Sequence, residues 1–125
     1  MTEDLTSVLE ELKAREPLFH HSQTVYTEEA FDAETDDEFF EIGASGAIYG
    51  RPFLRMLALQ RPVGSAAEDE LDGWRIRKLG PDTYLVTYTL KSKGRVTRRS
   101  TIWRKNDEKG WHALFRQGTV VQQDS

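Results

Sequence analysis

The chain has 125 residues and a mass of 14.4 kDa, which is the size of one ordinary domain. Hydrophobic residues make up 38% of it, so global disorder is excluded, and the lack of cysteine excludes disulfides, thiolate metal sites and cysteine nucleophiles. The formal net charge is -4, but the half of the chain before Ala47 is acidic and the half after it is basic. We interpret this asymmetry as an acidic helical layer that packs near a basic sheet, and the alternative is an interaction surface. Neither a membrane-length apolar run nor a signal peptide is present, which predicts a soluble, cytoplasmic protein.

Three helices are predicted in the first half of the chain. Leucines and a valine recur at helical spacing from Asp4 to about Glu16, and Pro17 ends this first helix. Thr27 is a good N-cap for a second, short helix that should end by Thr35. The tripeptide Gly50-Arg51-Pro52 then opens a third helix, because proline is tolerated in a first turn.

Strands are predicted between and after these helices. A short strand at 38–42 should turn at 44–46 into a brief return strand at 47–49, and residues 62–70 should form a loop. Four longer strands are expected to form a meander with hairpin turns between them: 72–79, 83–91, 95–105 and 111–119. The pattern predicts one α+β domain over residues 1–125, with its core at about 4–119, in which a curved antiparallel sheet wraps about three helices.

The carboxylates Asp32, Asp36, Asp37 and Glu38 lie where the second helix meets the first strand. A buried member of this group would have a raised pKa and suit a general base, with Tyr49, Tyr84 or Tyr88 as an oxyanion donor. We favour the alternative that they are solvated cap and turn residues, with Thr35 and Glu38 at capping-box spacing.

The three histidines are His20, His21 and His112. Their spacing matches no metal motif, so no metal and no cofactor are predicted. His20 or His21 could carry a proton from a loop, although adjacent loop histidines more often face solvent. We therefore keep Asp37 and His20 as the catalytic candidates.

Aromatic residues on the later strands, among them Tyr88, Trp103, Trp111 and Phe115, would suit the wall of a ligand pocket. Each of them is alternatively a core residue, because a one-residue change of register swaps the two faces of a strand. The basic residues near Trp103 do not predict nucleic-acid binding, because the sequence pI is about 5.4 and no binding motif is present.

Several short motifs occur in a fixed order: Glu41-Ile42-Gly43-Ala44-Ser45-Gly46, Tyr49-Gly50-Arg51, Tyr88-Thr89-Leu90, Arg99-Ser100-Thr101-Ile102-Trp103-Arg104, Gly110-Trp111 and Gln117-Gly118-Thr119. In this order and spacing they resemble the nuclear transport factor 2-like superfamily, and within it an uncharacterised bacterial branch near the SnoaL-like polyketide cyclases and ketosteroid isomerases. The resemblance implies a cone-shaped α+β barrel around a pocket, and a homodimer formed through the sheet. It does not imply one activity, because such folds catalyse, bind or only associate.

One residue departs from that branch, where many members carry a histidine before the Gln-Gly-Thr run and this chain has Arg116. A cationic donor there suggests an anionic or carbonyl-bearing ligand. We therefore expect a small-molecule-binding domain without a cofactor, membrane or nucleic-acid partner. Its ligand-binding candidates are Tyr49, Tyr88, Arg99, Trp103, Arg116 and Gln117. The alternatives are a proton-transfer enzyme, such as an isomerase, dehydratase or cyclase, and a dimeric interaction module with a filled pocket.

Overall fold

The computed structural model describes residues 5–16, 27–60, 69–92, 94–108 and 110–122. Its helices are α1 (Leu5–Arg15), α2 (Glu28–Glu34) and α3 (Arg51–Gln60). Its strands are β1 (Thr35–Ile42), β2 (Ile48–Gly50), β3 (Glu70–Gly80), β4 (Thr83–Ser92), β5 (Arg95–Asn106) and β6 (Gly110–Val120). The predicted α+β class and the predicted order of elements are confirmed.

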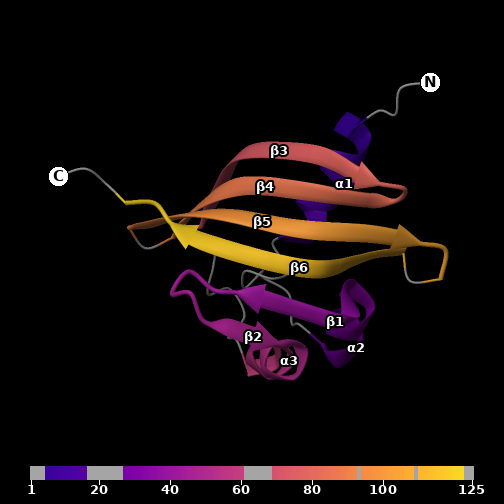
Figure 1. Ribbon diagram of the computed structural model, residues 1–125, viewed down its shortest axis with the longest axis horizontal. Coiled ribbons are helices and arrows are strands. Elements are labelled where there is room, and N and C mark those ends of the chain that lie inside the picture. Colours follow the sequence, from indigo (N-terminus) through magenta and orange to yellow (C-terminus); the bar gives the residue numbers. More distant parts are fainter. Residues whose placement is uncertain (1–4, 17–26, 61–68, 93, 109, 123–125) are drawn as a thin grey trace.

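The six strands form one curved sheet in the order β2-β1-β6-β5-β4-β3, whose two end strands do not pair with each other (Figure 1). Strands β3 to β6 make the predicted antiparallel meander. Strand β1 pairs antiparallel with β2 but parallel with β6, so the sheet is mixed where an antiparallel one was expected. This parallel pair joins the first half of the chain to its last described strand.

The sheet has an inner face, on which α1 packs, and an outer face opposite to it. Figure 1 shows α1 behind strands β3 to β5, with α2 and α3 gathered beside β1 and β2. Directly opposed residues of neighbouring strands share a face, and alternate residues of one strand change face. The registers of the four meander strands therefore assign each side chain to one face or the other.

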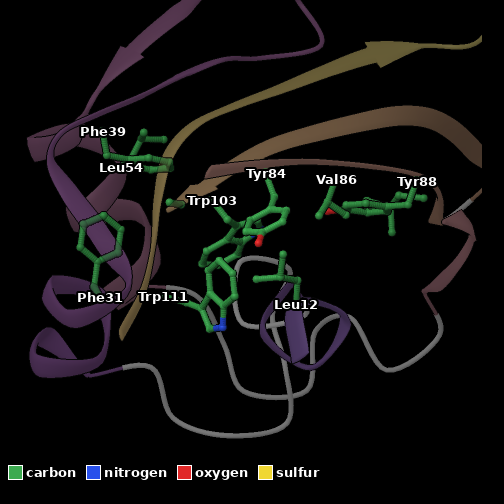
Figure 2. Packing of buried hydrophobic residues seen from close by; sticks show 11 residues of the cluster. Leu12, Phe31, Phe39, Leu54, Tyr84, Val86, Tyr88, Trp103 and Trp111 are labelled. Carbon is green, nitrogen blue, oxygen red and sulfur yellow. The ribbon is translucent and has the colours of Figure 1, made fainter. Parts of the chain in front are cut away.

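The hydrophobic core lies on the inner face. Figure 2 shows Leu12 of α1 close to Tyr84, Trp103 and Trp111, and all four side chains are almost fully buried. The rings of Tyr84 and Trp111 meet edge to face, with centroids 5.5 Å apart. A fully buried side chain of this size contributes about 1.5–3 kcal/mol to the free energy of unfolding, so this cluster fixes α1 against the sheet.

A second part of the core joins α2 and α3 to β1. Phe31, Phe39 and Leu54 are buried together there (Figure 2). Thr27 caps α2 as predicted, because its Oγ1 accepts a hydrogen bond from the backbone N–H of Ala30 at 3.1 Å. The turn between β1 and β2 also forms as predicted, with Gly46 at a φ of 92°.

The predicted capping box of Thr35 and Glu38 is wrong. Strand β1 begins at Thr35, three residues earlier than expected, and Thr35 is fully buried. Its hydroxyl donates to the Phe31 carbonyl at 2.7 Å and accepts from Arg51 Nε at 3.2 Å. Pairing with Ala113 of β6 draws Thr35 into the sheet, which overrides its local preference for a cap.

Some sequence-based predictions lie outside the described residues, namely His20, His21 and most of the loop expected at 62–70. Within the described ranges, no helix combines the length and the apolar character needed to span a membrane.

Candidate functional site

A buried carboxyl group, that of Glu16, lies where α1 ends against the inner face of the sheet. It follows Leu12 by one helical turn, so it continues the buried stripe of the helix, and it is 0% exposed. The Trp103 indole N–H donates to Glu16 Oε1 at 2.8 Å, and the Tyr88 hydroxyl donates to Oε2 at 2.9 Å. Both carboxyl oxygens are therefore held by aromatic residues of the sheet.

Burial raises the pKa of the Glu16 carboxyl above its ordinary value, because a charged carboxylate loses its hydration there. The hydrogen bond from Trp103 and the positive charge of Arg116 oppose this effect without overcoming it. Burial also raises the pKa of the Tyr88 hydroxyl well above its ordinary value, and the nearby charge of Glu16 adds to this. Glu16 and Tyr88 thus form a buried pair in which protons are held more tightly than in water.

Two arginines share the inner face with this pair. Arg99 of β5 lies opposite Gly118 of β6, and Arg116 lies opposite Thr101 in the next inward-facing row. Arg116 is almost fully buried, and its Nη2 lies 3.6 Å from a carboxylate oxygen of Glu41. The two guanidinium groups are diagonal neighbours on adjacent strands, which brings like charges close together.

The guanidinium group of Arg99 lies over Gly118. A β-carbon added to Gly118 would lie only 2.7 Å from Arg99 Nη1, so any other residue there would push the guanidinium group aside. Arg99 Nε donates to Thr97 Oγ1 at 3.0 Å. Burial and the neighbouring charge of Arg116 lower the pKa of Arg99. An anion beside these arginines would relieve their mutual repulsion.

The structure gathers four of the six predicted ligand-binding residues on the inner face: Tyr88, Arg99, Trp103 and Arg116. Tyr49 of β2 pairs with Glu41, which pairs in turn with Arg116, so it lies on that side of the sheet two strands away, where its ring stacks on Phe53 with centroids 5.2 Å apart. Gln117 pairs with Ser100 and so lies on the outer face.

Glu16, Tyr88, Arg99, Trp103 and Arg116 together are called the Glu16 cluster here. The predicted group of carboxylates at 32–38 does not join this cluster. Asp32 links α2 to α3 instead, accepting hydrogen bonds from Arg51 at 3.0 Å and from Arg55 at 3.0 and 3.2 Å, and the hydrogen bond from Arg55 contributes most to lowering its pKa. Asp37 is exposed, and His20 lies outside the described residues.

The other polar and aromatic candidates have different surroundings. His112 is buried, with its Nε2 3.7 Å from an oxygen of Asp36. Phe115 lies on the outer face, where its ring is 4.8 Å from that of Phe40. Among the described residues, no cluster of three or more histidine and acidic side chains is placed to hold a metal ion.

Sequence reasoning did not single out Glu16, although a signal for it is present. Glu16 stands four residues after Leu12, and Leu12 itself follows Val8 and Leu5 on the same stripe. A carboxyl group on the apolar stripe of an amphipathic helix is costly to bury unless it has hydrogen-bonding partners. That position marks Glu16 as a residue with a specific role.

Comparisons with known proteins identify the fold. No family model matches the chain, and no curated protein matches it. Solved structures do match over almost its whole length. An NTF-2-like protein of unknown function from Pseudomonas aeruginosa is 14% identical, with a TM-score of 0.69, and the match covers 93% of this chain and 99% of that one.

Two other similar structures carry functional descriptions. A protein from Parabacteroides distasonis, described as a proposed ketosteroid isomerase, is 15% identical with a TM-score of 0.67, and the match covers 90% of this chain and 86% of that one. A proposed Ca/calmodulin-dependent kinase II association domain from Exiguobacterium sibiricum is 13% identical with a TM-score of 0.67, and the match covers 99% of both chains.

The chain is therefore an α+β cone-fold protein with an open, curved sheet. Its fold is that of the nuclear transport factor 2-like superfamily, so the resemblance seen in the sequence is confirmed at the level of the fold. Because the identities are this low, the function has to be argued from the site itself.

Proposed function

We propose that the protein binds a small organic molecule with an anionic or carbonyl group on the inner face of its sheet. The observation that carries this proposal is the neighbouring placement of Arg99 and Arg116 on that face, beside the buried Glu16. Tyr88 and Trp103 supply the aromatic surface that such sites commonly use.

The charge balance of the cluster favours an anionic ligand. Arg116 is paired with Glu41, and burial favours the neutral form of Glu16. The cluster then holds the guanidinium groups of Arg99 and Arg116 and the carboxylate of Glu41. A ligand carboxylate or a polarised carbonyl oxygen would restore the balance by accepting hydrogen bonds from Arg99.

Thermal unfolding against a library of organic acids, ketones and metabolites tests this proposal. A ligand at a hundred times its dissociation constant adds about 2.7 kcal/mol to the free energy of unfolding, which raises the melting temperature by several degrees. We expect Arg99→Gln to abolish the shift. Arg104→Gln is the matched control, because Arg104 lies on the same strand but is exposed on the outer face, away from the inner-face cluster. Equal shifts in both variants, or no hit in the library, would contradict binding at the inner face.

Proton transfer is the second candidate function, and the Glu16–Tyr88 pair favours it. A buried carboxyl group with a raised pKa and a hydroxyl partner 2.9 Å away is the arrangement that general acid–base chemistry needs. If the ligand is a substrate, the protein should catalyse the exchange of the ligand's acidic C–H hydrogens with deuterium from D₂O, which NMR can follow. Glu16→Gln should stop the exchange while the ligand still binds, and exchange that continues in this variant would exclude Glu16 as the base.

We also propose that one apolar row of the outer face pairs with a second copy of the chain. A row of apolar side chains crosses four strands there: Phe40, Phe115, Ile102 and Leu85. Phe40 is 41% exposed, which is unusual for a phenylalanine in a sheet. Phe40→Glu should convert a dimer into a monomer in analytical ultracentrifugation, and a monomeric unsubstituted chain would contradict this proposal.

A further inference from the structure

A second concave region lies on the outer face, across the sheet from the Glu16 cluster. It is a groove of about 490 Å³, within the usual range for sites that hold small molecules. Four strands contribute to it, and its lining residues are Gly73, Arg75, Thr87, Tyr88, Thr89, Arg98, Arg99, Ser100 and Thr119.

The side chains of this groove are hydroxyls and guanidinium groups. In the register of the sheet, Arg75, Thr87 and Ser100 form one outward-facing row. Thr89, Arg98 and Thr119 form the next row. Tyr88 and Arg99 lie between these rows in the sequence, and their side chains point to the inner face.

Arg98 is held over the groove by a hydrogen bond. Its Nη1 donates to Thr89 Oγ1 at 2.8 Å, which aligns the guanidinium group with the threonine hydroxyl. A guanidinium group fixed beside hydroxyl groups is well suited to bind an oxyanion, because guanidinium groups bind carboxylates and phosphates through paired hydrogen bonds.

A β-bulge leaves the end of the groove open. The pairing of β3 with β4 shifts between Asp72 and Arg75, and Gly73 within the bulge has a φ of 68°. A β-carbon at Gly73 would lie 3.5 Å from Thr89 Oγ1. Glycine therefore provides the backbone conformation and keeps side-chain atoms away from the groove floor.

The charges around the groove leave it positive. The carboxylate opposite Thr89 in the register is that of Asp72, and it lies 3.4 Å from Lys91 Nζ. Glu70 lies opposite Lys91, so the three basic side chains Arg75, Arg98 and Lys91 stand against two carboxylates, and one positive charge is left to attract an anion.

We infer that this groove is an oxyanion-binding site, which takes the phosphate or carboxylate group of a small polar molecule between Arg75 and Arg98. The hydroxyls of Thr87, Thr89 and Ser100 line the floor on which the anion rests. This site is distinct from the one proposed on the inner face. It stands on different side chains, so the failure of either proposal leaves the other intact.

NMR titration of the full chain with pyrophosphate and, separately, with citrate tests this inference at constant ionic strength. We expect saturable shifts in the methyl signals of Thr87, Thr89 and Thr119, which face the groove. The methyl signals of Val86, which faces the core, should stay unchanged. A response to pyrophosphate alone would assign the site to phosphate groups, and a response to citrate alone would assign it to carboxylates.

Substitution of the arginines gives the second arm of the experiment. Arg98→Gln and Arg75→Gln should each weaken binding about tenfold, because each removes charge-assisted hydrogen bonds. Arg77→Gln is the matched control, since Arg77 lies on the same face two residues beyond Arg75 but outside the groove. All three side chains are exposed, so we expect the variants to fold with unchanged melting temperatures. Shifts that do not saturate, or equal losses in all three variants, would show nonspecific attraction and overturn the inference.

Discussion

Replacing Glu16 with glutamine should change how the stability of the protein depends on pH. Burial raises the pKa of Glu16, so over a range of pH the native protein keeps a proton that the unfolded chain releases. In that range, from the ordinary pKa of about 4.5 up to the raised native value, Glu16 makes the protein less stable as the pH rises. Below this range the ionisation of Glu16 does not change the free energy of unfolding. Above it, the reduction in the free energy of unfolding no longer depends on pH.

The size of this effect on stability is set by the single proton that Glu16 releases on unfolding. The limiting slope is about 1.4 kcal/mol of unfolding free energy per pH unit, which is about 5 °C in melting temperature for a domain of this size. Glutamine should fit the site, because its carbonyl can accept from Trp103 and its amide can donate to the Tyr88 oxygen. The Glu16→Gln variant should therefore gain stability relative to the unsubstituted protein as the pH rises through that range.

The assay is urea unfolding of both proteins from pH 4 to pH 9, followed by tryptophan fluorescence. The difference between the two free energies isolates Glu16, because every other titrating group is common to both proteins. Near-ultraviolet circular dichroism checks that the variant keeps its packed aromatic core. A difference that does not change with pH would refute the reasoning, since it would mean that Glu16 titrates alike in the native and unfolded chains.

Two further substitutions test other parts of the structure. Gly118→Ala should displace the Arg99 guanidinium group and so weaken anion binding at the inner face, whereas Gly80→Ala, with open space around its added methyl group, should leave that binding unchanged. Asp32→Asn should lower the melting temperature at neutral pH, because it removes the negative charge and one of the two oxygens that accept from Arg55. This difference should fade as the pH falls through the lowered pKa of Asp32, and a difference that persists at acid pH would contradict an electrostatic role.

The meander could be predicted from the sequence because its signals are local. The turn at Pro81-Asp82 and the alternation on either side of it place β3 and β4 within one or two residues of their observed bounds. The start of β1 could not be predicted in this way. Its first residues, 35–38, are polar and resemble a cap, and only the distant strand β6 makes them extended.

The candidate site shows a similar division. Arg99, Trp103 and Arg116 were predicted to act together, and the structure places them on one face. Gln117 was grouped with them as a polar residue suited to orient a ligand, but alternation along β6 places it on the other face. The register of β5 with β6 shifts between Ile102 and Trp103, and no residue pattern in either strand reveals such a bulge.

The parallel pairing of β1 with β6 has a consequence for how the chain matures during synthesis. Hairpins of the meander can form as soon as each pair of strands has emerged, because their contacts are close in sequence. Strand β1 is synthesised long before β6 and must wait for it, so α2, β1 and α3 assemble around an unpaired strand edge until then. Any change that delays or removes β6 therefore exposes this early segment, and the abundant acidic residues around β1 are well placed to keep it from aggregating meanwhile.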